Sequence, residues 1–104
     1  MHKVSLKACH IIIEAELAKT YLHNDNFALV SYKAEESTLI VSPTKNDWLK
    51  SIHKASPFML KHKDLSGTRS IAVHELLIDH ELEDHDRSLN FETDDVLEFL
   101  KIKI

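Results

Sequence analysis

The hydrophobic and polar positions near the N-terminus fit two different structures. Val4, Leu6 and Ala8 alternate with polar residues, which is the pattern of a half-buried strand. A stripe that runs through Val4 and Ala8 also has the spacing of an amphipathic helix. The β-branched run Ile11–Ile13 favours a strand over residues 3–13. The pattern alone leaves the choice between strand and helix open.

The pattern is clearer from residue 14 onward. Residues 14–22 contain closely spaced Ala and Leu and predict a short helix, which the polar cluster at 23–26 ends. Residues 27–32 and 38–41 are apolar, strand-like runs. The polar connector at 33–37 has the length of a hairpin turn, so these two runs predict an antiparallel pair.

The middle of the chain predicts a helical insertion over about residues 44–65. Thr44 is a suitable N-cap, and the apolar residues that follow lie on one helical face: Trp48, Ile52 and Ala55. Ser56-Pro57 has the form of a second N-cap followed by proline at the first helical position. We expect a second short helix there, closed by Gly67.

The last third of the chain predicts further strands. Residues 70–79 form a strand-like run, and residues 80–86 form a charged loop. Residues 87–93 and 96–104 predict a closing hairpin. We therefore expect one domain, residues 1–104, of the α+β class. It should hold a largely antiparallel sheet of about six strands, a short N-terminal helix and the central helical insertion.

The chain also carries a weak internal echo. Ile11–Leu17 and Leu76–Leu82 match in kind at most positions, and each is followed by a polar stretch and two strand-like runs. Both halves would then be one strand–connector–hairpin unit. The match is short, so duplication and chance both remain open.

The order strand, short helix, strand, turn and strand over residues 11–41 resembles the swapped-hairpin families AbrB and MraZ. In those families two copies intertwine, and many members bind DNA as oligomers. The resemblance therefore implies an intertwined fold and a role associated with nucleic acid. Where those families carry Pro, Arg and Gly-Asp, this chain has Glu14, Lys19 and Asp25-Asn26.

Charge is segregated along the chain. The formal net charge is −4, which disfavours a general nucleic-acid binder. Residues 1–74 carry 10 Lys/Arg against 7 Asp/Glu, whereas residues 75–98 carry 10 Asp/Glu against Arg87 alone. Such polarity is typical of two solvated faces, or of a surface that meets an oppositely charged partner.

Cysteine content and hydropathy bear on the compartment. Cys9 is the only cysteine, so no intramolecular disulfide forms, and we predict a cytoplasmic protein. The longest clearly apolar runs, at 11–13 and 76–78, are three residues long, whereas a membrane span needs roughly 20. We expect no membrane association.

Few residues offer chemistry. Gly67 is the only glycine, which excludes a glycine-rich phosphate loop, and we expect no cofactor. His80, Asp84 and His85 are candidate ligands for a divalent metal such as zinc, although an acidic solvent loop is the more ordinary explanation of these residues. Within one loop, these are the residues close enough in sequence to bind one ion.

Two further pairs of residues are candidates for nucleophilic or acid–base chemistry. Cys9 and His10 would face opposite sides of a strand, so we interpret Cys9 as a small buried residue rather than a nucleophile. Glu75 and Asp79 would share one face of the predicted strand at 70–79. A carboxylate pair acts as acid and base when it lines a pocket, whereas exposed charge on a strand is common.

Basic residues with interleaved aromatic residues in the central segment indicate a candidate polyanion-binding face. Its members are Lys45, Lys50, Lys54, Lys61 and Lys63, with Trp48 and Phe58 between them. A solvated helix face accounts for the same lysines, and Trp48 also fits the apolar stripe.

The sequence thus favours a non-enzymatic interaction module that forms a homo-oligomer and binds a protein partner of unknown identity. No catalytic or cofactor motif is present, and the charge is polarised. The first alternative is a nucleic-acid-associated regulator of the swapped-hairpin type. The second is a metal-dependent enzyme that uses the loop from His80 to His85.

Overall fold

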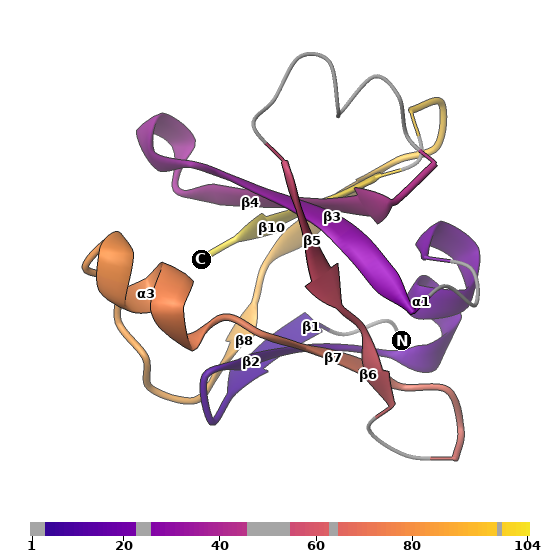
Figure 1. The fold of residues 1–104 in the computed structure, drawn as a ribbon, viewed down its shortest axis with the longest axis horizontal. Helices are drawn as coiled ribbons and strands as arrows, with labels where there is room; N and C mark the ends of the chain where they lie inside the picture. Colours follow the sequence, from indigo (N-terminus) through magenta and orange to yellow (C-terminus); the bar gives the residue numbers. More distant parts are fainter. Residues whose placement is uncertain (1–3, 23–25, 46–54, 63–64, 98) are drawn as a thin grey trace.

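The computed structural model describes residues 4–22, 26–45, 55–62, 65–97 and 99–104. Its strands form two five-stranded sheets in which neighbouring strands are antiparallel (Figure 1). The first sheet has the order β6-β7-β2-β1-β8, with the bounds β1 Val4–Lys7, β2 His10–Ile13, β6 Lys61–His62, β7 Arg69–Ala72 and β8 Arg87–Leu89. The second has the order β5-β3-β4-β10-β9, with the bounds β3 Phe27–Lys33, β4 Thr38–Pro43, β5 Ser56–Met59, β9 Phe91–Asp94 and β10 Phe99–Lys103.

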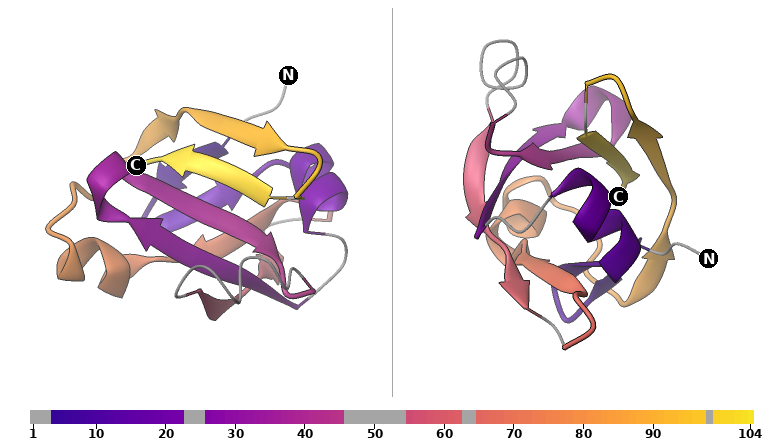
Figure 2. Two further views of the ribbon diagram at one scale, coloured as in Figure 1. Left: turned by 90° about the horizontal axis from the view of Figure 1, so that it is seen from above. Right: turned by 90° about the vertical axis from the view of Figure 1, so that its right-hand side faces the viewer.

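Two bent strands join these sheets into a closed ring. Only Leu60 separates β5 from β6, and only Asn90 separates β8 from β9, so each strand continues from one sheet into the other. At the first corner the Leu60 amide donates to the Asn26 carbonyl (2.8 Å), and the buried Arg69 guanidinium donates to the Leu60 carbonyl (2.9 Å). At the second corner the Lys103 amide donates to the Asn90 carbonyl (2.8 Å). The right panel of Figure 2 looks along the ring.

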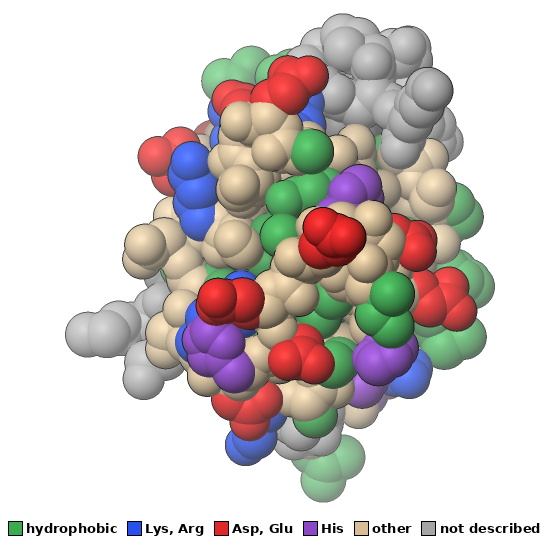
Figure 3. All heavy atoms as spheres, turned by 90° about the vertical axis from the view of Figure 1, so that its left-hand side faces the viewer, with side chains coloured by type: hydrophobic (Ala, Val, Ile, Leu, Met, Phe, Trp, Pro, Cys, Tyr) green, Lys and Arg blue, Asp and Glu red, His purple; other side chains and the backbone are tan. Residues whose placement is uncertain are grey.

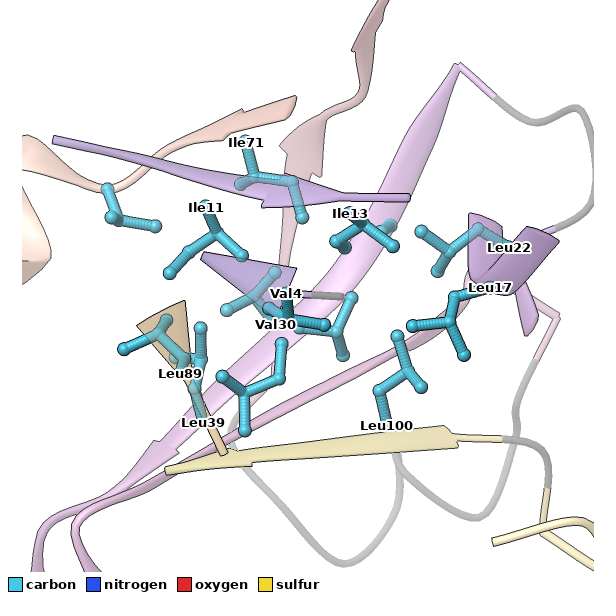
Figure 4. Packing of buried hydrophobic residues seen from close by; sticks show 14 of the residues in the cluster. Val4, Ile11, Ile13, Leu17, Leu22, Val30, Leu39, Ile71, Leu89 and Leu100 are labelled. Atoms are coloured by element: carbon cyan, nitrogen blue, oxygen red, sulfur yellow. The ribbon is translucent and has the colours of Figure 1, made fainter. Parts of the chain in front are cut away.

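Apolar side chains from both sheets fill the ring (Figure 4). Alternate residues of each strand point inward, so Ile11 and Ile13 from β2 meet Leu39 from β4 and Leu100 from β10. Truncating one such leucine to alanine typically costs about 2–5 kcal/mol, so this core is the main source of stability. A smaller cluster, consisting of Leu29, Ile40 and Phe99, lies on the outer face of the second sheet.

The two described α-helices lie at opposite ends of the ring (Figures 1 and 2). α1 (Ala15–Tyr21) lies across one end and buries Leu17, Ala18 and Tyr21. α3 (His74–Asp79) lies at the other end and buries Leu77. Within the described residues, no helix is long and apolar enough to cross a membrane.

The order of elements repeats within the chain. β1–β2–α1–β3–β4 is followed by β5/β6–β7–α3–β8/β9–β10, and the two halves interleave because β2 pairs with β7 and β4 pairs with β10. The unit of strand, connector and hairpin is therefore present twice. The sequence echo nevertheless aligned the wrong residues, because 11–13 lie in β2 whereas 76–78 lie in α3.

Several expectations from the sequence are confirmed. The fold is α+β, and the N-terminal segment is extended rather than helical: β1 and β2 form a hairpin. The turn between them places Ala8 (φ 50°) and Cys9 (φ 62°) in the left-handed region. α1, β3 and β4 lie where the pattern predicts them, and the 3-10 turn η1 (Ala34–Glu36) joins the two strands.

Other expectations are wrong. The second helix of the central insertion is absent, because Ser56–Met59 and Lys61–His62 are strands β5 and β6. Pro57 is tolerated there because the amides of successive residues in a strand point to opposite sides. The Leu60 amide points toward β3 and donates to the Asn26 carbonyl, so the nitrogen of Pro57, three residues earlier, points away from β3. The first helix of the insertion falls mostly on residues 46–54, which lie outside the described residues.

The strand predicted for residues 70–79 is also only partly present. β7 ends at Ala72, and the chain then forms α3, which buries Leu77 and leaves Glu75 exposed; a continued strand would have turned Glu75 to the same inward face as Ile71 and Val73. The strands are divided between two sheets instead of forming a single sheet of about six.

Candidate functional site

A groove of about 690 Å³ opens at the α3 end of the ring. We call it the α3 groove. Figure 3 faces this end and shows apolar side chains at its centre, with histidine and acidic side chains around them. The residues that line the groove come from α3 and from the facing ends of three strands: Val30, Ser31 and Tyr32 of β3, Ser56 and Phe58 of β5, Ala72 of β7, and His74, Glu75, Leu76, Asp79 and His80.

The groove exists because the wall of the ring is interrupted there. β5 pairs with β3 over its whole length, but only β6 pairs with β7, at Lys61–Ser70 and His62–Arg69. Among the described residues no strand pairing joins β5 to β7. The gap between them leads to inward-facing side chains of β3 and β5, and α3 lies beside it.

α3 positions the polar side chains of the groove. Leu77 anchors the helix in the core, and its amide donates to the Val73 carbonyl (2.9 Å). Glu75 and Asp79 are four residues apart, so both lie on the exposed face that lines the groove. The helix ends in a Schellman motif, in which Glu81 takes a left-handed conformation (φ 53°).

The same motif fixes His80 against β3. The Glu81 amide donates to the Ile78 carbonyl (3.2 Å), and the Leu82 amide donates to the Leu77 carbonyl (2.8 Å). His80 precedes this turn, and its ring lies 4.4 Å from the Tyr32 ring, centroid to centroid, at an interplanar angle of 50°. With half-buried Phe58, these rings give the groove an aromatic wall.

The groove is acidic. Its described lining contains the carboxylates of Glu75 and Asp79 and no Lys or Arg. Neither carboxylate has an ion-pair partner within the described part of the chain. Arg87, the one Lys or Arg of the acidic segment at residues 75–98, donates instead to the backbone carbonyls of Glu83 and His85. The electrostatic potential here therefore favours a cationic ligand.

The structure does not assemble the candidate metal ligands His80, Asp84 and His85. His80 stacks on Tyr32, whereas the exposed His85 lies 3.4 Å from a Glu83 carboxylate oxygen. Within the described ranges, no three His, Cys, Asp or Glu side chains are close enough together to hold a metal ion.

The candidate polyanion-binding lysines are only partly described. Lys45 and Lys61 are exposed, at the end of β4 and in β6. Lys50, Lys54 and Lys63 lie outside the described residues, as does Trp48. Phe58 faces the α3 groove rather than a basic surface.

A different basic group lies on the outer face of the second sheet. Lys33, Lys101 and Lys103 line a smaller hollow of about 230 Å³, together with Glu36 and Glu92. Lys33 lies 3.9 Å from the Glu36 carboxylate, and Lys101 lies over the Phe99 ring, 5.8 Å from its centroid. The carboxylates offset much of the positive charge of this hollow.

The remaining candidate residues from the sequence are Cys9, His10, Glu75 and Asp79. Cys9 is half-buried in the turn between β1 and β2 and packs against the main core, whereas the sequence predicted a buried residue on a strand. His10 contacts the Ala8 carbonyl through Nδ1 (2.8 Å) and lies on β2. Glu75 and Asp79 do share a face and a groove, but on a helix rather than on the predicted strand.

The sequence pattern did not mark Tyr32 or Ala72 as site residues, and it grouped Phe58 with the candidate polyanion-binding lysines. Tyr32 and Phe58 are distant from α3 along the chain, whereas Ala72 lies two residues before it, and each has the character of an ordinary strand residue. The only available signal was the apolar–acidic pattern of residues 74–80, which becomes a site only after β3 and β5 are placed beside it.

Comparison with known proteins adds no relative. No family model, no curated protein and no solved structure matches this chain.

Proposed function

We propose that this protein is a non-enzymatic interaction module that holds a segment of a partner protein in the α3 groove. The observation that carries the proposal is the interrupted wall of the ring. Among the described residues β5 is not paired with β7, and apolar and aromatic side chains line the groove beside them. Concave, largely apolar surfaces with a few polar groups are the usual form of binding sites.

The proposal is tested by selecting a random peptide library on the intact protein. Ala72→Trp places a large side chain into the groove from an exposed position, so selected peptides should bind roughly tenfold or more weakly, equivalent to about 1.4 kcal/mol. Ser88→Trp is the matched control, because Ser88 is exposed on the same sheet but does not line the groove. Peptides that bind A72W as tightly as the native protein would contradict the proposal.

Self-association is part of the proposal, and one surface supports it. Phe27 and Met59 are paired across β3 and β5 and are 46% and 57% exposed. A second copy would cover this pair. Light scattering should then give a mass above 12.0 kDa that falls to 12.0 kDa in a Phe27→Ser, Met59→Ser variant. A native monomer would remove self-association. A cytoplasmic location, inferred from the lone Cys9, belongs to the same proposal.

A second candidate function is a nucleic-acid-associated regulator of the swapped-hairpin type. The interleaving of two strand–helix–hairpin halves within one chain supports it, by analogy with the two intertwined copies of the swapped-hairpin families. A mobility shift with duplex DNA that weakens as salt rises would support this role. Lack of a shift at low salt would remove it, because phosphate contacts are strongest there.

A further inference from the structure

We infer that the α3 groove recognises its partner through a basic side chain, a lysine or an arginine carried on the bound segment. This inference rests on the proposed function and specifies the chemistry of the ligand. It draws on three properties of the groove: its charge, its aromatic wall and its size.

The first property is uncompensated negative charge. Glu75 and Asp79 both line the groove, one helical turn apart, and neither has an ion-pair partner in the described part of the chain. A guest ammonium or guanidinium placed between them would contact carboxylates that no cation of the described residues occupies. An acidic guest would meet two like charges at the same position, which selects against it.

The second property is the aromatic wall formed by Tyr32, His80 and Phe58. Cations bind favourably to the faces of tyrosine and phenylalanine rings, and the aliphatic stem of a long basic side chain packs on apolar surface while its head stays polar. Leu76 and Val30 supply that apolar surface. The chain already holds one lysine over an aromatic ring, at Lys101 and Phe99.

The third property is size. A volume of about 690 Å³ accommodates a long side chain together with the backbone that carries it, because binding pockets of about 300–1,000 Å³ hold drug-sized ligands. A site for a bare metal ion or a single ammonium would be smaller. The size therefore fits a peptide segment that inserts one basic residue.

The test uses single-residue probes and the full chain. Nα-acetyl methylamides of lysine, arginine, norleucine and citrulline are titrated while the ring resonances of Tyr32, Phe58 and His80 are followed by NMR. The two cationic probes should shift these resonances, and their uncharged counterparts should bind roughly tenfold more weakly. Equal binding of lysine and norleucine, or no shift with any probe, would overturn the inference.

Two double variants separate local recognition from general acidity. Glu75→Gln with Asp79→Asn should abolish the preference for the cationic probes. Glu83→Gln with Asp84→Asn removes the same charge from the neighbouring exposed loop and should change binding less than twofold at physiological salt, because exposed charges are screened over about 8 Å. An equal loss in both variants would contradict a local cation site.

The outcomes also separate this inference from the proposed function. If selected peptides bind the groove but tolerate replacement of every Lys and Arg by norleucine and citrulline, the module stands and the basic-residue inference fails. If the single-residue cations bind but no peptide does, the proposed function fails and the groove remains a site for small basic ligands.

Discussion

Tyr21 and His80 show how single residues fasten the two helices to the ring. Each lies at the C-terminal end of its helix, and each contacts the hairpin of the other half of the chain. The Tyr21 hydroxyl donates to the Asp95 carboxylate beyond β9, whereas His80 stacks on Tyr32 in β3. The phenol makes a directional hydrogen bond, and the imidazole makes a ring contact that leaves the α3 groove open beside it.

The hydrogen bond gives Tyr21 a measurable signature. It raises the pKa of the Tyr21 phenol above its ordinary value of 10.0, because the Asp95 carboxylate accepts the hydrogen bond from the phenol O–H and repels the phenolate. Folding then favours the protonated phenol. This contribution to stability is complete below pH 10 and is lost as the pH rises through the higher pKa of the folded state.

We predict that Tyr21→Phe lowers the free energy of unfolding at neutral pH and removes part of its decline above pH 10. Urea unfolding at several alkaline pH values measures both effects. Tyr32→Phe is the control, since the Tyr32 hydroxyl has no hydrogen bond among the described residues. An alkaline decline in Y21F as steep as in the native protein would contradict the assigned role of Asp95.

At the scale of elements, α3 is short and depends on its terminus. It buries only Leu77, and helices this short are unstable without tertiary support. Its Schellman motif places a non-glycine residue, Glu81, at a positive φ of 53°. A left-handed conformation costs an ordinary residue roughly 1–2 kcal/mol, which glycine avoids.

We therefore predict that Glu81→Gly raises the free energy of unfolding by about 1 kcal/mol, measured by urea denaturation. Glu83→Gly adds a glycine to the same exposed loop without relieving a positive φ, so it should leave stability unchanged or lower it. Destabilisation by E81G would mean that the Glu81 side chain, rather than its backbone, secures the end of α3.

The elements differ in how well the sequence predicts them. α1, β3 and β4 have local signals: helix-forming residues, apolar runs and a polar turn of hairpin length. α3 has none, because Leu76–Ile78 suits a strand equally well, and its terminus uses glutamate instead of glycine. Ser56-Pro57 resembles a helix start, but pairing with β3 determines the structure of β5. Tertiary contacts override local preference at both places.

The groove is less predictable than any element. Its two carboxylates and His80 are close together in the sequence, but its aromatic wall comes from β3 and β5. The position of β3 and β5 relative to α3 depends on the strand β5/β6, which lies between β3 and β7 and bends at Leu60. The order of strands around the ring determines this position, and the local sequence does not reveal it.

At the scale of the whole molecule, the two halves of the chain interleave in one ring, but the two ends of that ring differ. At one end α1 buries three side chains and makes the Tyr21–Asp95 bond. At the other end α3 buries one side chain and leaves the α3 groove. Glu75 and Asp79 line the groove at this end. We therefore propose that binding occurs at this end of the ring, in the α3 groove.

The footprint of a selected peptide on the intact protein shows whether binding occurs in the α3 groove. Backbone and ring resonances are mapped by NMR as the peptide is added. We predict that the largest changes fall on Tyr32, Phe58, Leu76 and His80. Changes centred instead on Lys33, Lys101 and Lys103 would place the binding surface on the outer face of the second sheet and would rule out binding in the α3 groove.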